Sequence, residues 1–397
     1  MGAGEITFWA EMLVLAGTVF VVLYYIFTSR RKYKPYFDVK NQNDNKDKVA
    51  EEEEVFTVFL IGDAGSPNLN SPDPVLSLLK SQLQREGEKS SLFFLGDNVY
   101  PVGIPATTSQ LHETALKRLT ALLEAVKDFK GKTYFISGNH DWNKGRKGGW
   151  ESILREQEYI QAFLGKENVF LPKNGCPGPV EVKLSQKTTA IIINTSWWVH
   201  TDTKPLGAKD GCTVDSKEAF FSELEAMMER NKDKKIIVIA HHPLYSNAVH
   251  GGNFHLKQHL FPLTELHKKA YVPLPLVGSL YPLYRKYVGI REDMAHPLYR
   301  KMRKRLIAIF QKHENLIYAA GHDHNLQYIK KGKQHYLVSG SGSKVHFVKQ
   351  GGAGVFFTHA HRGFMRLGFC PNEVWLRIIE PVEGTPKGKV VFKQCLF

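Results

Sequence analysis

The fold and the site are decided by one short stretch, Gly96-Asp97-Asn98-Val99-Tyr100. It follows the apolar run 92–95, which predicts a short buried strand. A carboxylate directly after such a strand lies at the strand's carboxyl edge, where ligands bind in open α/β sheets. Asp97 offers hard oxygen ligands that are able to bridge two cations, and Tyr100 is able to bind one of them as a phenolate. We therefore interpret Asp97 as the centre of a two-metal site.

Four more apolar runs end in residues that bind metals. The runs and the residues that follow them are 55–61 with Asp63, 133–136 with Asn139, 236–240 with His241, and 316–319 with His322 and His324. Each has an ordinary explanation when taken singly, because an Asp after Gly often forms a turn and a buried His often belongs to the core. Five such coincidences in one chain favour a metal site over turns.

The same strands set the fold class. They alternate with helices that are predicted over 74–84, 109–128, 150–164 and 216–230. Short strands alternating with helices indicate a layered α/β fold with sheets in the middle.

Composition limits the function without deciding it. The chain has 397 residues, enough for one large domain or two small ones, and a net charge of +14. That charge favours anionic partners such as phosphorylated substrates, nucleic acid or an acidic lipid surface. No block of Lys and Arg with interleaved aromatics resembles a nucleic-acid motif, so no nucleic-acid partner is expected. The four cysteines form no CxxC pair, and the sequence leaves open whether Cys176 and Cys212 are bridged.

The N-terminal region predicts a membrane anchor. Residues 7–28 are almost wholly apolar, with Glu11 as their only charge, and are long enough to span a bilayer. Basic residues follow this run and none precedes it, which favours an uncleaved anchor over a signal peptide. We therefore predict a single-pass membrane protein, with the lipid bilayer as a partner through residues 7–28. The positive-inside rule favours the cytoplasmic side for the rest of the chain.

The predicted organisation has three parts. Residues 1–29 are the transmembrane anchor with a short N-terminal flank, 30–54 are a charged linker, and 55–397 are the catalytic domain. Residues from about 251 to 296 are rich in proline, aromatic and basic residues, and they predict a long excursion near the site mouth. Its segment 271–288 either rests on a membrane or packs on its own domain.

Five blocks of the sequence resemble the motifs of the calcineurin-like metallophosphoesterases. In chain order they are Gly62-Asp63, Gly96-Asp97-Asn98, Gly138-Asn139-His140-Asp141, His241-His242-Pro243 and Gly321-His322-Asp323-His324. Most of that superfamily has Asp-x-His in the first block, whereas this chain has Asp63-Ala64-Gly65. The purple acid phosphatases, and their tartrate-resistant branch in particular, also lack that histidine and use a tyrosine at the position of Tyr100. The resemblance implies a four-layer αββα sandwich and two metal ions.

The resemblance also implies a role for each site residue. One metal ion would be held by Asp63, Asp97, Tyr100 and His324, and the other by Asp97, Asn139, His241 and His322. The first site would favour Fe(III) because phenolate is a hard anionic donor, and the second would take Zn, Mn or Fe(II). His140 and His250 are the candidates for protonating or stabilising the leaving group. His242 and Asp323 are expected to contact the metal ligands rather than the metals.

The predicted function is a membrane-anchored, binuclear metal-dependent phosphohydrolase of the acid phosphatase type. It would hydrolyse phosphate monoesters of small molecules or phosphoproteins by attack of a metal-bound hydroxide. A phosphodiesterase or nucleotide-pyrophosphate hydrolase with the same metals is one alternative. An inactive membrane-anchored scaffold is the other, although it predicts broken ligands and none of the seven is broken. Family analogy places the domain outside the cytoplasm, against the charge rule, and the tartrate-resistant branch has no counterpart of the insert 251–296.

Overall fold

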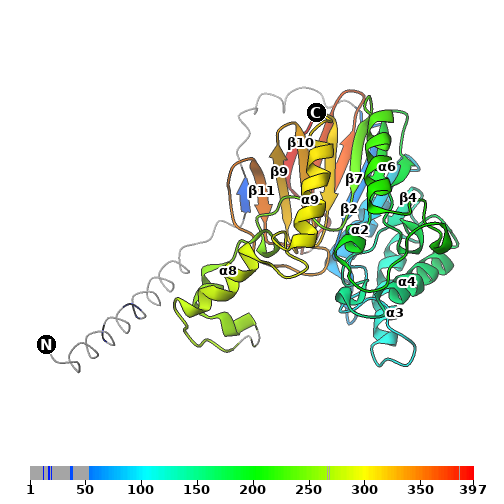
Figure 1. The fold of residues 1–397 in the computed structure, drawn as a ribbon. Coiled ribbons are helices and arrows are strands. Elements are labelled where there is room, and N and C mark those ends of the chain that lie inside the picture. Colours follow the sequence, from blue (N-terminus) through cyan, green and yellow to red (C-terminus); the bar gives the residue numbers. More distant parts are fainter. Residues whose placement is uncertain are drawn as a thin grey trace.

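The architecture consists of two mixed β-sheets with helices outside them (Figure 1). The computed structural model describes residues 12, 17, 19, 36–38, 53–265, 267, 269–383 and 385–397. Within these residues the strands form one eight-stranded and one six-stranded sheet. The predicted α/β fold of sheets flanked by helices is thereby confirmed, whereas the predicted boundaries at residues 29 and 54 stay predictions.

The six-stranded sheet has the order β14-β13-β12-β2-β3-β4, in which β2, β3 and β4 are parallel. Its strands are β2 (Phe56–Ile61), β3 (Ser90–Phe94), β4 (Lys132–Phe135), β12 (Phe364–Phe369), β13 (Val374–Val382) and β14 (Thr385–Cys395). The register pairs Ile61 with Phe94, and Phe94 with Phe135. The turns that follow β2, β3 and β4 therefore meet at one edge of this sheet.

The eight-stranded sheet has the order β1-β11-β9-β10-β8-β7-β6-β5. Its strands are β1 (Tyr36–Asp38), β5 (Val180–Lys183), β6 (Thr188–Ile192), β7 (Lys235–Ile239), β8 (Leu316–Ala320), β9 (Leu326–Lys331), β10 (Gln334–Ser339) and β11 (Val355–His359). Strands β6, β7, β8 and β10 run parallel, so the ends of β7 and β8 also share an edge.

The central strands are buried on both faces, and apolar residues make up most of their length. In β2, Val58 and Leu60 join the core shared by the two sheets, while Phe59 and Ile61 join the core that the helices cover. The covering helices are α2 (Pro74–Leu83), α3 (His112–Val126), α4 (Gly149–Leu164), α5 (Thr195–Val199), α6 (Lys217–Arg230) and α9 (Pro297–Phe310). Because both faces are buried, strands such as β7 and β8 have consecutive apolar residues rather than an alternating pattern.

The insert is more helical than its sequence predicts. It contains α7 (Leu256–Leu260) and α8 (Leu280–Tyr287) with two short 3-10 helices, Pro262–Glu265 and Val277–Ser279, between them. Helix α8 protrudes from the body of the molecule (Figure 1). The chain then returns to the body at Ile290, which borders the candidate site.

The prediction of a single-pass membrane location is contradicted. In the described part of the chain, no helix combines the length and the apolar character that crossing a membrane requires. Apart from Met12, Gly17 and Val19, the predicted span 7–28 lies outside the described residues, as does most of the predicted linker 30–54. The proposed bilayer contact through residues 7–28 falls on the same residues.

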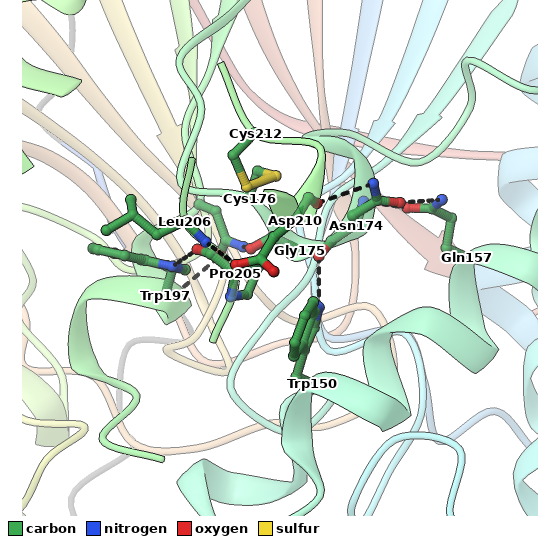
Figure 2. Close-up of a disulfide and its surroundings, with 11 residues drawn as sticks. Trp150, Gln157, Asn174, Gly175, Cys176, Trp197, Pro205, Leu206, Asp210 and Cys212 are labelled. Atoms are coloured by element: carbon green, nitrogen blue, oxygen red, sulfur yellow. Dashed lines mark hydrogen bonds between the residues drawn. A yellow bond between two sulfur atoms is a disulfide. The ribbon is translucent and has the colours of Figure 1, made fainter. Parts of the chain in front are cut away.

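A disulfide joins Cys176 to Cys212, a pairing that the sequence left open (Figure 2). The two cysteines are 36 positions apart in the sequence. Polar contacts surround it: the Asn174 amide donates to the Asp210 carbonyl at 3.4 Å, and the Trp150 indole donates to the Asn174 carbonyl at 2.9 Å. The segment after α5 is therefore tied to the segment before β5 by covalent and polar contacts together.

Candidate metal centre

The seven predicted donors converge at the carboxyl edges of both sheets, and we call them the strand-end cluster. Three follow the parallel strands of the six-stranded sheet, one lies in the loop after β3, and three follow β7 and β8. The members are Asp63, Asp97, Tyr100, Asn139, His241, His322 and His324. All seven side chains are buried. The donors thus reach one place from segments that are far apart in the sequence.

One half of the strand-end cluster centres on a phenol. The Tyr100 hydroxyl lies 3.0 Å from Asp63 Oδ1 and 2.8 Å from His324 Nε2. His324 Nε2 is in turn 3.4 Å from Asp63 Oδ1. A carboxylate, a phenol and an imidazole therefore meet within hydrogen-bonding distance.

The other half centres on an amide oxygen. Asn139 Oδ1 lies 2.9 Å from His241 Nε2 and 3.1 Å from His322 Nδ1, and these two nitrogens are 3.2 Å apart. The outer nitrogen of each ring donates to a backbone carbonyl, that of Leu95 for His241 and that of Glu292 for His322. In a neutral ring the inner nitrogen then carries a lone pair. Three lone-pair donors that face one another suit a cation between them.

Asp97 lies between the two halves. Its Oδ1 is 3.6 Å from His241 Nε2 and accepts a 2.8 Å hydrogen bond from the His140 backbone N–H. Single donor atoms of Asp63, Asp97 and His241 all lie within 4.8 Å of one another. The geometry therefore suits a carboxylate shared by two ions.

The titration of the buried acids reflects this crowding. Burial, together with the neighbouring Asp97, raises the pKa of Asp63 well above its usual value. Burial and Asp63 likewise raise the pKa of Tyr100. Burial alone would raise the pKa of Asp97 as well, but His140 and His241 lower it. Ionisation of both carboxyls and the phenol in one buried site would require compensating positive charge, which bound cations would supply.

The backbone at three of the donors is unusual. Asp63, Asp97 and His322 have φ angles of 58°, 55° and 69°, in the left-handed region that non-glycine residues seldom adopt. Gly96, with φ 87°, cannot carry a Cβ, because it would meet the Gly138 nitrogen at 2.5 Å. Such conformations persist where the surrounding structure imposes them, and they are concentrated at functional sites.

A cavity of about 430 Å³ opens over the strand-end cluster. Its lining combines metal-binding donors with imidazoles and cations: Asp97, Asn139, His140, Lys144, His250, Ile290, Arg291, Glu292, His322, His324 and His346. Lys144 and Arg291 are far apart in the sequence but close together in the structure. The Arg291 guanidinium donates to the carbonyl of Gly145, the residue after Lys144, at 3.1 Å. The cavity therefore offers two positive groups to an anionic ligand.

The two predicted catalytic histidines both border this cavity. His140 Nδ1 donates to the Pro101 carbonyl at 2.7 Å, and its Nε2 lies 3.9 Å from Asp97 Oδ2. His250 Nδ1 lies 2.9 Å from Asp293 Oδ1. Burial lowers the pKa of His140 to about 4, whereas Asp293 outweighs the burial of His250 and raises its pKa.

His242 and Asp323, predicted to support the ligands, lie beside them. The His242 ring is 4.4 Å from the His322 ring, and its Nδ1 is 3.0 Å from Thr195 Oγ1. Asp323 Oδ1 accepts from the His250 backbone N–H at 3.5 Å.

Sequence reasoning missed the residues that the insert brings to the site. Glu292 contacts two site histidines, with its carboxylate 3.3 Å from His242 Nε2 and its carbonyl 2.9 Å from His322 Nε2. Asp293, which holds His250, is itself paired with the Arg285 guanidinium from α8. The only signal in the sequence was the charged run Arg291-Glu292-Asp293 at the end of an otherwise basic insert.

The family comparison agrees with the fold. The family model of the calcineurin-like phosphoesterases matches residues 56–362. That match covers every member of the strand-end cluster and confirms the resemblance drawn from the five sequence blocks. A search of curated proteins found no match.

Solved structures give similarity at the level of fold. Purple acid phosphatase PPD1 from yellow lupin seeds aligns with a TM-score of 0.51 and 16% identity, over 87% of this chain and 54% of that chain. This chain thus spans about half the length of the lupin protein. GAP50, described as the anchor in the inner membrane complex of Plasmodium, aligns with a TM-score of 0.48 and 14% identity, over 86% of this chain and 88% of that one.

Proposed function

Because this chain belongs to the calcineurin-like phosphoesterases, a family that binds a dinuclear metal site, we propose that it is a binuclear metal-dependent phosphohydrolase acting on phosphate monoesters. The observation that supports this most is the convergence of seven intact donors in two groups with Asp97 between them. An inactive member of the family has no need to keep that set complete.

The donor chemistry fits two metal ions. We assign Asp63, Asp97, Tyr100 and His324 to one ion, with Fe(III) as the metal that suits a phenolate. Asp97, Asn139, His241 and His322 are assigned to the other, which would be Zn, Mn or Fe(II). When bound, two such ions acidify water and neutralise charge on a phosphoryl group.

The chain's own residues bind and protonate the substrate. Lys144 and Arg291 attract the phosphate dianion into the cavity that they line. His250 is held by Asp293 through Nδ1, so its Nε2 is the atom available to the leaving-group oxygen. His140, fixed by the Pro101 carbonyl, contacts Asp97 from the cavity side and orients this carboxylate. The cavity of about 430 Å³ has room for a small phosphorylated substrate.

The test compares an aryl phosphate monoester with its diester. We expect the purified protein to hydrolyse 4-nitrophenyl phosphate faster than bis(4-nitrophenyl) phosphate. Asp97→Ala should lose this activity while still unfolding in a cooperative thermal transition, and Asp128→Ala, a change of an exposed carboxylate, should keep the activity and the thermal midpoint of the wild type. Faster diester hydrolysis would overturn the monoester assignment. A folded protein with two equivalents of metal that hydrolyses neither substrate would overturn the enzymatic function.

The metal assignment has its own test. Tyr100→Phe should abolish a visible charge-transfer absorption band of the iron-containing protein. A fully active protein that contains no iron would contradict the Fe(III)–phenolate assignment and leave the dinuclear hydrolase intact.

A further inference from the structure

Two histidines and a glutamate form a second group of donors, which we call the crossover cluster. His359 ends β11, His361 lies in the connection to β12, and Glu380 belongs to β13. His359 and Glu380 are 8% and 5% exposed, whereas His361 remains accessible. None of the three lines the cavity over the strand-end cluster.

Both imidazoles of the crossover cluster face one carboxylate. His359 Nδ1 lies 2.5 Å from Glu380 Oε1. His361 Nδ1 lies 3.2 Å from Glu380 Oε2 and 3.0 Å from the Arg362 backbone carbonyl, so its Nε2 is also open to a ligand. The two rings are stacked, with centroids 5.1 Å apart and planes at 10°. One ligand atom from each residue fits within a span of 4.8 Å.

We propose that the crossover cluster is a metal site for a divalent d-block cation such as Zn²⁺. Two imidazoles and one carboxylate form a donor set that binds such cations and leaves a coordination position open. Metal–ligand distances of about 2.0–2.2 Å require small side-chain shifts from donors that already lie this close. Mg²⁺ and Ca²⁺ are disfavoured because they prefer oxygen ligands throughout.

The position of the cluster shows what the ion would do. Strand β11 belongs to the eight-stranded sheet and β13 to the six-stranded one, and the connection that carries His361 crosses between them. An ion held by all three residues joins the two sheets at that crossing. It would stabilise the folded state in proportion to its binding, because the unfolded chain does not present the three donors together.

Access to the cluster is open on the side of His361. A cavity of about 780 Å³ borders this residue and is lined also by Pro74, Val382 and Glu383. The adjacent cation, Arg362, is directed elsewhere: its guanidinium donates to both Asp73 oxygens at 2.8 Å and to the Gly342 carbonyl at 2.7 Å. Its charge is therefore engaged by a carboxylate outside the cluster.

The test counts metal ions. The protein is loaded with Zn²⁺, desalted and analysed for its elements, alongside His361→Ala and, as a matched exposed control, His267→Ala. We expect His361→Ala to bind one equivalent less than the wild type, and His267→Ala to bind as much. The difference of one equivalent is independent of whether the strand-end cluster fills, so it separates this proposal from the proposed function.

Two further readouts complete the test. Added Zn²⁺ should raise the thermal midpoint of the wild type more than that of His361→Ala, and the variant should keep its phosphatase activity. If the Glu380→Gln variant folds, it should also bind one equivalent of Zn²⁺ less than the wild type. Equal stoichiometry in the wild type and His361→Ala would overturn the proposal and leave the crossover cluster as hydrogen-bonded side chains only.

Discussion

The strand-end cluster and the crossover cluster use the same kinds of donor in different settings. The first gathers seven buried donors at the ends of parallel strands, below a cavity that Lys144 and Arg291 line. The second has three donors at a connection between sheets, where no parallel strands end. Donor type alone therefore does not distinguish a reaction centre from a structural site. Position at parallel strand ends and cations placed for an anionic substrate do.

Metal removal should give the largest contrast between the two clusters. Dialysis against a strong chelator should lower the hydrolysis of 4-nitrophenyl phosphate by more than roughly 10⁴-fold, because the ions supply the nucleophile and the charge stabilisation. Before chelation, His361→Ala should be as active as the wild type, because the substitution leaves the strand-end cluster intact. After chelation, it should lose its activity to the same extent as the wild type. If the protein remained active after its metal content had been shown to be zero, the strand-end cluster would not be a metal-dependent reaction centre.

Substitution of His250 should have the next largest effect. His250→Ala removes the imidazole that Asp293 holds toward the cavity. We expect kcat for an alkyl phosphate to fall between about 10² and 10⁴-fold, because its leaving group needs a proton, and kcat for an aryl phosphate to fall less. His112→Ala, outside the cavity, is the matched control. An equal loss with both substrates would contradict the proton-donor role.

The disulfide supplies a reference that belongs to neither cluster. Cys176→Ser with Cys212→Ser should lower the free energy of unfolding by about 2–4 kcal/mol, the range expected for a loop of this length. The Zn²⁺ stoichiometry should not change. Chemical denaturation of the double variant and of the wild type under non-reducing conditions measures the difference. A loss of metal in this variant would show that the clusters respond to general destabilisation.

The smallest effect concerns an ion pair that needs no metal. Glu54 contacts Arg366 of β12 and Arg377 of β13, the strand that carries Glu380. Burial alone would raise the pKa of Glu54, but the two guanidinium groups lower it below its usual 4.5. Its contribution is therefore present above pH 4.5 and is lost as the pH falls through the lowered pKa.

Glu54→Gln should accordingly cost up to about 1 kcal/mol at pH 7, a value kept small because the carboxylate is partly exposed to solvent. The difference from the wild type should shrink when denaturation is measured below pH 4. A constant difference across this range would assign the effect to packing instead of charge.

Much of the fold and the centre of the site could be predicted because both follow from short local patterns. Buried strands such as 92–95 are apolar throughout, and a ligand such as Asp97 comes directly after them. Glu292 and Asp293 could not be placed, because the insert has no strand or helix period that leads to the site. The crossover cluster could not be predicted for another reason. His359 and Glu380 lie on different sheets, and sequence spacing does not reveal which strands come close together. The membrane location was predicted from hydropathy and flanking charges and is contradicted.

The strand-end cluster draws Asp63, Asp97 and Asn139 from one sheet and His241, His322 and His324 from the other. Neither sheet alone provides all the donors of the strand-end cluster. A rearrangement that moves the two sheets relative to each other would separate these two groups of donors, even if each sheet kept its own strands. We therefore expect metal content to report on the contact between the sheets more sensitively than a spectroscopic measure of β-structure. A cut of the chain between β6 and β7 would leave Asp63, Asp97 and Asn139 on one piece and the three histidines on the other.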